Sequence, residues 1–436
     1  MRVALLYPEV YDMARFREER REFPPFGVLY LAAVCEQAGH EVAIEKVTPS
    51  RTRLDLAGFD AVGFSLASSA TYGIMLRARQ QSIIRDDALV MVGGVHCNFY
   101  PESSLRDFRA HLAADGESEE TILAVLEQHQ NGTLAAVPGI LYMDGDQVRR
   151  TASRPLLRNI DDLPLPARHL LPRQDIVIPD RLAGTDLVMA HVMFSRGCPF
   201  PCSFCAAGQT RIQYRGGASA LAELEHLVEA YAIEGFAIVD DNFIVARQKV
   251  GDICDHIAHL GLRWSALSRV DTVDEALLAK MARAGCIEIK YGMESGSERL
   301  LKAMRKNTKR AQIKRAVHMT NDAGIEAKVF VIHGFPGETS ETTEETVSLL
   351  QELGASVSRV SLFRFVPLPG TEVYDHADLY GVRGTHLQHD WDGDWDKFHI
   401  HHNTRRWWGN DHEWAELENA YTRLHEFVES SWNPQG

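Results

Sequence analysis

The chain of 436 residues lacks the long hydrophobic runs and the basic tracts that mark several classes of protein. No run of about 18 apolar residues is present, and the first residues are typical of a buried strand rather than of a secretion signal. Lys and Arg are not clustered, and the formal net charge is −14. Because nucleic acids and anionic membranes bind clustered cations, we expect neither as a partner, and we expect a cytoplasmic location.

Cysteine is also scarce, with 7 residues and no spacing typical of a disulfide scaffold. Four of these cysteines stand alone in apolar surroundings and are expected in the core: Cys35, Cys97, Cys254 and Cys286. The other three are crowded at Cys198, Cys202 and Cys205. This distribution favours a reducing compartment and a metal site over disulfide crosslinks.

The length predicts two or three domains, since a domain usually spans roughly 100–200 residues. The order of apolar runs predicts an α/β protein. Over residues 1–145, short apolar runs alternate with amphipathic stretches, which predicts a Rossmann-like doubly wound domain that ends in a hairpin around ILYMDGDQV. Residues 146–185 contain several prolines and are expected to form an extended linker.

The alternation resumes over residues 186–375, where six strand patterns separated by helical patterns predict a partial β/α barrel. Chemistry in such a barrel gathers at the carboxyl ends of the strands. Residues 376–436, rich in tryptophan and histidine, are expected to form a short helical and irregular tail that covers the site.

The three crowded cysteines form a CxxxCxxC motif directly after the first barrel strand. Thiolates are soft ligands for iron–sulfur clusters or zinc. Three thiolates on a four-iron cluster leave one iron open for a small molecule, whereas a structural zinc site needs a fourth ligand such as His191. Three buried thiols without a metal are the third interpretation.

This motif resembles the signature of the radical S-adenosylmethionine (SAM) family, and the N-terminal domain resembles that of the subgroup with a cobalamin-binding-like domain. The resemblance implies that Cys198, Cys202 and Cys205 hold a [4Fe–4S] cluster. The open iron would bind SAM, and an electron from an external reductase, of the flavodoxin or ferredoxin type or a dedicated partner, would cleave SAM to a 5′-deoxyadenosyl radical.

The resemblance also assigns SAM contacts on the cysteine loop and on the next strand. Phe204 corresponds to the aromatic residue that lies against the adenine. Asp240, Asp241 and Asn242 end a strand and would lie near the methionine end of SAM, although Asp and Asn are also favoured as helix caps.

Two further strands end in polar residues. Ser265 and Arg269 come from one of them, and the planar guanidinium makes Arg269 a candidate for the SAM carboxylate, with a salt bridge to Asp271 as the alternative. By resemblance, Glu294 and Ser295 lie at the ribose, while Ser295 could also cap a helix.

Glycines follow strands at two places. Gly334 and Gly337, in GFPGET, resemble the family's loop near the adenine, or form a plain Gly-Pro turn. Gly93 and Gly94, with Ser65 on the neighbouring strand, could admit cobalamin at the sheet edge. The motif that supplies a lower axial histidine in other cobalamin proteins is absent, and the domain could also be a scaffold without cobalamin.

Three histidines are candidates for acid–base catalysis, since imidazole titrates near neutrality: His333, His401 and His402. The main functional hypothesis is hydrogen-atom abstraction from a small molecule, such as an aminoglycoside sugar or a polyol, followed by dehydration, deoxygenation or rearrangement. Cobalamin-dependent C-methylation is the alternative within the family. A zinc-knuckle module that binds nucleic acid is the alternative of another class.

Overall fold

The computed structural model describes residues 1–9, 24–131, 134–382, 395–398 and 405–432. The chain forms two compact units, Met1–Ile176 with Trp391–Lys397, and Val177–Asp390 with Phe398–Gly436. No helix among the described residues is long and apolar enough to cross a membrane. The four isolated cysteines are buried, as expected.

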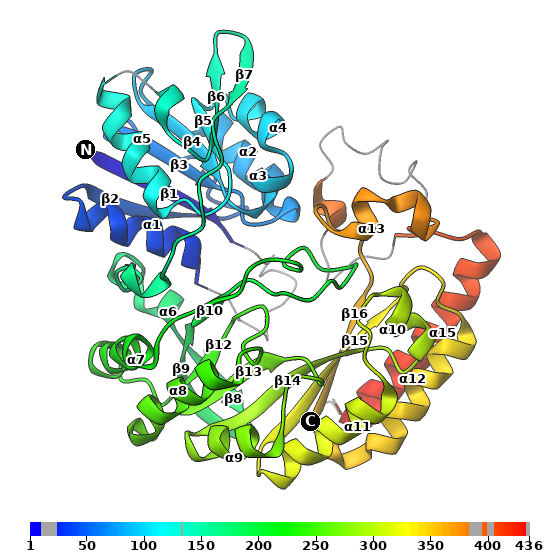
Figure 1. The fold of residues 1–436 in the computed structure, drawn as a ribbon. Helices are drawn as coiled ribbons and strands as arrows, with labels where there is room; N and C mark the ends of the chain where they lie inside the picture. The colour runs from blue at the N-terminus through cyan, green and yellow to red at the C-terminus, as the bar shows by residue number, and fades with distance from the viewer. Residues whose placement is uncertain (10–23, 132–133, 383–394, 399–404, 433–436) are drawn as a thin grey trace. The chain divides into compact units, whose positions relative to one another are not determined.

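The first unit is built on a seven-stranded sheet with the order β2-β1-β3-β4-β5-β6-β7 (Figure 1). Its parallel strands are β1 (Arg2–Pro8), β2 (Glu41–Val47), β3 (Ala61–Ser65), β4 (Leu89–Gly93) and β5 (Leu112–Ala114). Its helices are α1 (Phe26–Gln37), α2 (Tyr72–Gln81), α3 (Val95–Phe99), α4 (Pro101–Asp107), α5 (Glu119–Asn131) and α6 (Arg173–Ile176). Central strands such as β1 are continuously apolar because both faces of the sheet are covered. The Rossmann-like prediction is confirmed.

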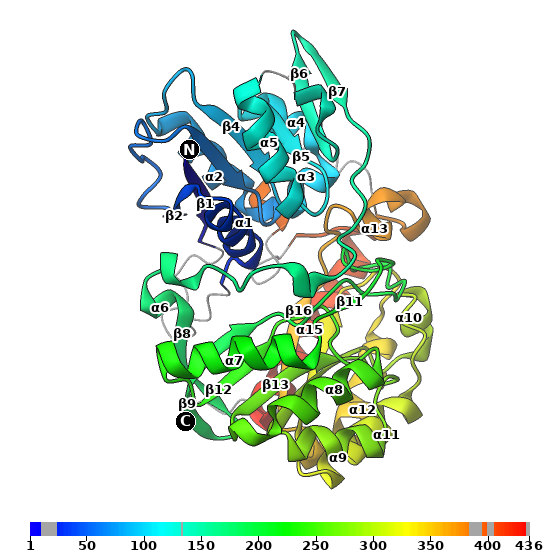
Figure 2. The ribbon, with the colours of Figure 1, turned by 60° about the vertical axis from the view of Figure 1, so that its left-hand side comes forward.

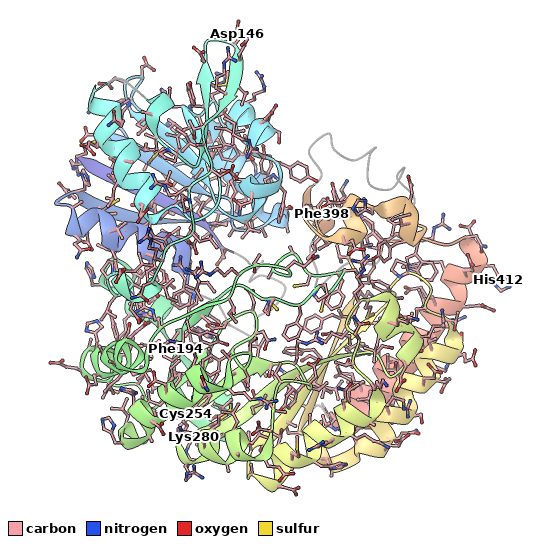
Figure 3. The ribbon with its side chains drawn as sticks, viewed as in Figure 1. Asp146, Phe194, Cys254, Lys280, Phe398 and His412 are labelled. Carbon is pink, nitrogen blue, oxygen red and sulfur yellow. The ribbon has the colours of Figure 1, made fainter. Side chains whose placement is uncertain are left out.

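The end of the first unit differs from the expected boundary at residue 145. The hairpin pairs β6 (Ile140–Asp144) with β7 (Gln147–Arg150), and Asp146 lies at its tip (Figure 3). Beyond it, the Ala167 N–H donates to the Leu29 carbonyl at 3.2 Å, and Lys46 pairs with Asp175 at 3.2 Å. Much of the proline-rich segment therefore packs on the first unit.

The second unit is a partial barrel whose sheet has the order β16-β15-β14-β13-β12-β9-β8. Its parallel strands are β9 (Thr185–Val192), β12 (Gly235–Ile238), β13 (Arg263–Ser268), β14 (Cys286–Glu294), β15 (Glu326–His333) and β16 (Arg359–Arg364). The six expected strands are all present. A seventh strand, β8 (Val177–Leu182), pairs antiparallel with β9 inside the segment expected to be a linker.

Helices cover the outer side of this curved sheet (Figures 1 and 2). They are α7 (Gly217–Tyr231), α8 (Arg247–Ile257), α9 (Glu275–Arg283), α11 (Arg310–Asp322) and α12 (Ser340–Leu353), with the shorter α10 (Glu298–Ala303) and α13 (Glu372–Asp375) after β14 and β16. Cys254 on α8 and Lys280 on α9 mark this layer (Figure 3). Their outward position leaves the carboxyl ends of the strands to the loops.

The tail contributes one long helix, α15 (Asp411–Trp432), beside the edge strand β16. Arg364 of β16 forms a two-pronged ion pair with Glu418, and the indole N–H of Trp432 donates to the Val357 carbonyl at 2.8 Å. The helix therefore covers the side of the barrel, whereas the expectation placed the tail over the site.

Candidate functional site

The three crowded cysteines lie on one loop that a short antiparallel ribbon closes. The ribbon pairs β10 (Ser195–Arg196) with β11 (Gln213–Tyr214). Gly197 begins the loop with φ +85°, and a Cβ there would lie 2.5 Å from the Arg211 carbonyl oxygen, so only glycine fits. The Cys198 N–H donates to Thr210 Oγ1 at 2.8 Å, which ties the two ends of the loop together.

The thiol groups share this loop in different surroundings. Cys198 is buried, while Cys202 and Cys205 keep some exposed surface. Burial raises the pKa of Cys205 to about 11, and the nearby Cys202 and Cys198 raise it further. Burial also raises the pKa of Cys202, while the cations Lys306 and Arg269 oppose that effect.

This donor set suits an iron–sulfur cluster. Three soft donors on one closed loop match a four-iron cluster with one open iron. Within the described residues, no three His, Cys, Asp or Glu side chains are arranged to hold a single metal ion. The assignment of the three thiols to a cluster stays a prediction.

Backbone hydrogen bonds hold the middle of the loop from two sides. The Ser203 N–H donates to the Met304 carbonyl at 2.9 Å, and the Val373 N–H donates to the Ser203 carbonyl at 3.0 Å. The segment after α10 and the helix α13 therefore both position the cysteines. Phe204 lies on the same stretch and is partly exposed.

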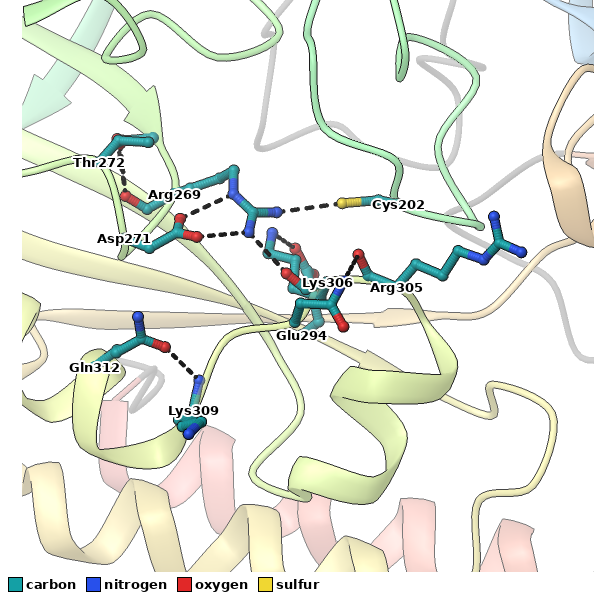
Figure 4. A network of polar contacts seen from close by, with 11 residues as sticks. Cys202, Arg269, Asp271, Thr272, Glu294, Arg305, Lys306, Lys309 and Gln312 are labelled. Atoms are coloured by element: carbon teal, nitrogen blue, oxygen red, sulfur yellow. Dashed lines mark hydrogen bonds and ion pairs between the residues drawn. The ribbon is translucent and has the colours of Figure 1, made fainter.

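Arg269 lies directly beside the loop (Figure 4). Its guanidinium donates to Cys202 Sγ at 3.3 Å and to both carboxylate oxygens of Asp271 at 2.9 and 2.8 Å. It also donates to the Lys306 carbonyl at 2.7 Å, and its Cζ lies 4.0 Å from the ring centre of Phe200. The alternative salt bridge with Asp271 is thus present, and the arginine is already occupied.

Glu294 occupies a strained position at the end of β14, with φ +63°. It is buried and pairs with Lys306 Nζ at 2.8 Å, also shown in Figure 4. Ser295 accepts a hydrogen bond from the Ser297 N–H at 3.1 Å and lies 3.3 Å from Thr346 Oγ1. Its hydroxyl therefore serves the local turn, while Glu294 reaches the neighbourhood of Cys202 through Lys306.

In the Asp-Asp-Asn segment after β12, the two aspartates have a different role from the asparagine. Asp240 accepts from Ser195 Oγ at 2.6 Å and from the Phe194 N–H at 2.9 Å, and burial raises its pKa to about 7. Asp241 accepts a hydrogen bond from the Gly197 N–H, while burial raises its pKa. Both aspartates therefore brace the cysteine loop.

Asn242 differs from these aspartates because its amide makes no hydrogen bond within the described residues. The side chain is 2% exposed, and neither its oxygen nor its nitrogen has a partner in the part of the chain that the structure describes. A buried amide without partners costs free energy, which a polar ligand with both donors and acceptors would recover. Of the three residues, Asn242 best fits a bound SAM.

Ser265 does not lie at the end of its strand. It is the third residue of β13, is fully buried, and accepts a hydrogen bond from Lys290 Nζ at 3.2 Å. The sequence pattern placed Ser265 at the carboxyl end of the strand, but three more strand residues follow it, up to Ser268. This geometry does not support Ser265 as a SAM contact.

The GFPGET loop follows β15 and is held by three side chains. Gly334 and Gly337 have φ +93° and +85°, so the turn itself requires glycine. The Trp408 indole N–H donates to the Gly334 carbonyl at 2.8 Å, and Arg299 donates to the Gly337 carbonyl at 2.9 Å. The buried Glu338 accepts the Gly334 N–H, which fixes the loop from within.

The structure does not support His333 as a catalytic base. Its ring is buried between α12 and α15, with Nε2 3.3 Å from Thr343 Oγ1 and the ring 5.4 Å from that of Tyr421. Burial, together with Arg364, lowers its pKa to about 3, so the imidazole stays neutral. His401 and His402 lie outside the described residues.

In the first unit, Ser65 and Gly93 lie opposite each other at the carboxyl ends of β3 and β4 and keep exposed surface. Gly94 follows with φ +100°, and a Cβ there would lie 2.8 Å from the Leu66 carbonyl oxygen, so the protein's own backbone requires this glycine. Val95 beside it is 50% exposed. An open edge with small and apolar residues fits a flat cofactor such as cobalamin.

His96 follows this edge but cannot serve as an axial ligand there. It is fully buried, its Nδ1 lies 2.9 Å from Ser69 Oγ, and burial lowers its pKa to about 4. Any cobalamin on this edge would therefore lack a histidine ligand from this position.

Sequence reasoning missed three residues of the second unit that the fold brings to the site: Phe200, Lys306 and Glu338. Phe200 lies within the cysteine motif, so its position could have drawn attention. Lys306 carries no local signal, because its partners are fixed by the packing of loops. Glu338 belongs to the GFPGET motif, but its residue type alone did not show that it accepts the Gly334 N–H of its own loop.

Two family models match the chain. A model of the radical SAM superfamily matches residues 192–350, and a model of the B12 binding domain matches residues 18–126. The two matches fall in the two compact units. The cofactors of this domain pair are a [4Fe–4S] cluster and SAM, and the B12-binding match supports cobalamin.

Individual relatives agree with the family models. An uncharacterized methyltransferase of Pyrococcus horikoshii is 30% identical over 367 residues, which cover 81% of this chain and 78% of the relative. An anaerobic magnesium-protoporphyrin IX monomethyl ester cyclase of Rubrivivax gelatinosus is 26% identical over 394 residues, or 86% and 69% of the two chains.

A solved structure shows the same fold. The radical SAM methyltransferase TsrM from Kitasatospora setae, with cobalamin and a [4Fe–4S] cluster bound, superimposes with a TM-score of 0.70 and 17% identity. The match covers 98% of this chain and 89% of that one. The protein described here belongs to the radical SAM superfamily, in the subgroup that carries an N-terminal B12-binding domain.

Proposed function

We propose that the chain is a cobalamin-dependent radical SAM methyltransferase that acts on a small molecule and draws electrons from an external reductant. The observation that carries this proposal is the union of a B12-binding domain with a radical SAM domain in one chain. A relative named as a methyltransferase, 30% identical to this chain, supports it. The dehydration or deoxygenation of a sugar or polyol, our main expectation from the sequence, finds no support among the relatives described.

The described residues suit this chemistry. Bound cofactors would supply the electron and the methyl carrier. Cys198, Cys202 and Cys205 would hold the cluster, and the amide of Asn242 would orient the amino acid end of SAM. Glu294, which pairs with Lys306 at 2.8 Å, offers a carboxylate for hydroxyl groups such as those of a ribose.

A second candidate function is ring formation, which the cyclase relative's name describes. The relevant observation is the alignment with the Rubrivivax gelatinosus cyclase over 86% of this chain. Both candidates use the same two domains, so products derived from SAM must separate them.

The test uses full-length protein, reconstituted without oxygen and supplied with cobalamin, SAM and a low-potential reductant. S-adenosylhomocysteine forms when the methyl group leaves SAM, and 5′-deoxyadenosine forms when the ribose C–S bond breaks. The products are measured by mass spectrometry. Detection of both S-adenosylhomocysteine and 5′-deoxyadenosine would support methyl transfer. 5′-Deoxyadenosine without S-adenosylhomocysteine would favour the cyclase-type reaction and overturn our proposal.

The cysteine assignment has its own test. Replacing Cys198, Cys202 and Cys205 by alanine should abolish iron incorporation and formation of both products, because no three thiolates remain on the loop. Cys254→Ala is the matched control, since that cysteine is buried in α8. Iron retained by the triple variant at the level of the control would refute the assignment.

A further inference from the structure

We propose that Arg269 sets the reduction potential of the cluster by donating a hydrogen bond to the sulfur of Cys202. The inference rests on the cluster of the proposed function. It gives Arg269 a role that differs from the expected one, binding of the SAM carboxylate. Arg269 is therefore a positioning residue that acts on the cluster through one of its ligands.

The direction of the Arg269 guanidinium is fixed by its contacts (Figure 4). Nη1 lies 3.3 Å from Cys202 Sγ, a hydrogen-bond distance for sulfur. The opposite edge is bound by both oxygens of Asp271 at 2.9 and 2.8 Å, and Nη2 also donates to the Lys306 carbonyl at 2.7 Å. These contacts leave Nη1 as the donor that faces the sulfur.

The guanidinium also packs against the cysteine loop. Its Cζ lies 4.0 Å from the ring centre of Phe200, which belongs to the cysteine loop itself. Arg269 is only 6% exposed, so bulk water screens its charge little. The cation is thus attached to the loop at two points, Phe200 and Cys202.

The contacts of Arg269 leave little of its guanidinium for a SAM carboxylate. A bidentate contact with a SAM carboxylate needs a pair of parallel N–H groups. In this structure such a pair is taken by Asp271. Binding the SAM carboxylate in that way would require Arg269 to release either Asp271, or both Cys202 and the Lys306 carbonyl.

The positive charge of Arg269 affects the reduction of the cluster electrostatically. One electron passes from a low-potential donor of the flavodoxin or ferredoxin class to the cluster, which gains one negative charge with no bond made or broken. That charge spreads over the cluster and its sulfur ligands, and hydrogen bonds to the sulfurs are known to set cluster potentials. A buried N–H donor with positive charge at Cys202 stabilises the reduced state and makes reduction easier.

The experiment is a redox titration of full-length reconstituted protein without SAM, with the reduced cluster followed by electron paramagnetic resonance. Arg269→Gln should lower the ratio of reduced to oxidised cluster about tenfold at a given potential, a shift of about 59 mV for one electron. Arg269→Lys keeps the positive charge but loses the planar guanidinium, so it should shift the midpoint potential less. Arg247→Gln is the control, because Arg247 also pairs with an aspartate, Asp274, at 2.9 Å.

The outcomes separate the two roles of Arg269. A wild-type midpoint in Arg269→Gln, at full iron content, would overturn the proposal, and weaker SAM binding measured beside it would restore the carboxylate role. If Arg269→Gln fails to retain iron, Asp271→Asn decides. Loss of the Asp271 carboxylate should raise the midpoint potential of the cluster. An unchanged midpoint potential would overturn the proposal.

The titration needs neither cobalamin nor a methyl acceptor. Its failure therefore differs from failure of the proposed function, which would appear as a wild-type protein without a reducible cluster or without S-adenosylhomocysteine.

Discussion

Glu338 shows how a single buried carboxyl group connects protonation to stability. It accepts hydrogen bonds from the backbone N–H groups of Gly334 and Phe335, yet burial raises its pKa from 4.5 to about 8. The folded state therefore holds this proton more tightly than the unfolded state. Stability from this group is fully present below the unfolded pKa and is lost as pH rises toward the folded pKa.

We predict that Glu338→Gln flattens the decline in thermal stability between about pH 5 and 8, where this one group can contribute up to about 1.4 kcal/mol per pH unit. Melting temperatures of wild type and variant across that range provide the measurement. The exposed Glu344→Gln on α12, the helix that follows Glu338, is the control. Parallel pH profiles for wild type and Glu338→Gln would contradict the prediction.

At the scale of single residues, the roles of some residues could be predicted from the sequence and those of others could not. The cysteine spacing is a local property of the chain, so it could be recognised before any fold was known. His333 looked like a catalytic base because its residue type allowed it. The side of β15 from which it projects decided otherwise, since it faces α12 and α15.

At the scale of elements, the cysteine loop depends on one backbone conformation. Gly197→Ala would place a Cβ 2.5 Å from the Arg211 carbonyl oxygen, in addition to the usual penalty for a left-handed residue of about 1–2 kcal/mol. We predict that this variant loses most of its iron and melts at a lower temperature. Iron analysis of the reconstituted protein and thermal melting are the measurements.

Gly261→Ala is the matched control, because Gly261 also has a positive φ of +67° but has open space around it. It should lose some stability and keep its iron. Equal iron content in the two variants would show that closure of the loop does not depend on Gly197.

At the scale of the whole molecule, α15 packs beside β16, the strand that ends the order of the barrel sheet. Leu417, Ala420, Leu424 and Val428 are buried on one side of this helix, at roughly 1.5–3 kcal/mol for each fully buried large side chain. Ending the chain after Asn410 should expose this surface and the edge of β16. We predict a lower melting temperature and self-association, because exposed edges pair with other chains.

Light scattering after size-exclusion chromatography and thermal melting test that prediction. A chain that ends after Trp432, which keeps α15 whole, is the control and should match wild type. A monomeric protein with wild-type melting temperature after the shorter truncation would show that α15 is dispensable.

The sequence by itself determined the α/β class, the six barrel strands and the cysteine motif that identifies the superfamily, because periodicity and spacing are local properties. Only the tertiary structure decided which side chains and strands contact one another. It joined Arg269 to Asp271 and Cys202, paired Glu294 with Lys306, added β8 to the barrel sheet and buried His333 under α15. Such contacts depend on which loops and faces meet when the elements pack, and that information is spread over the whole chain rather than held in any one segment.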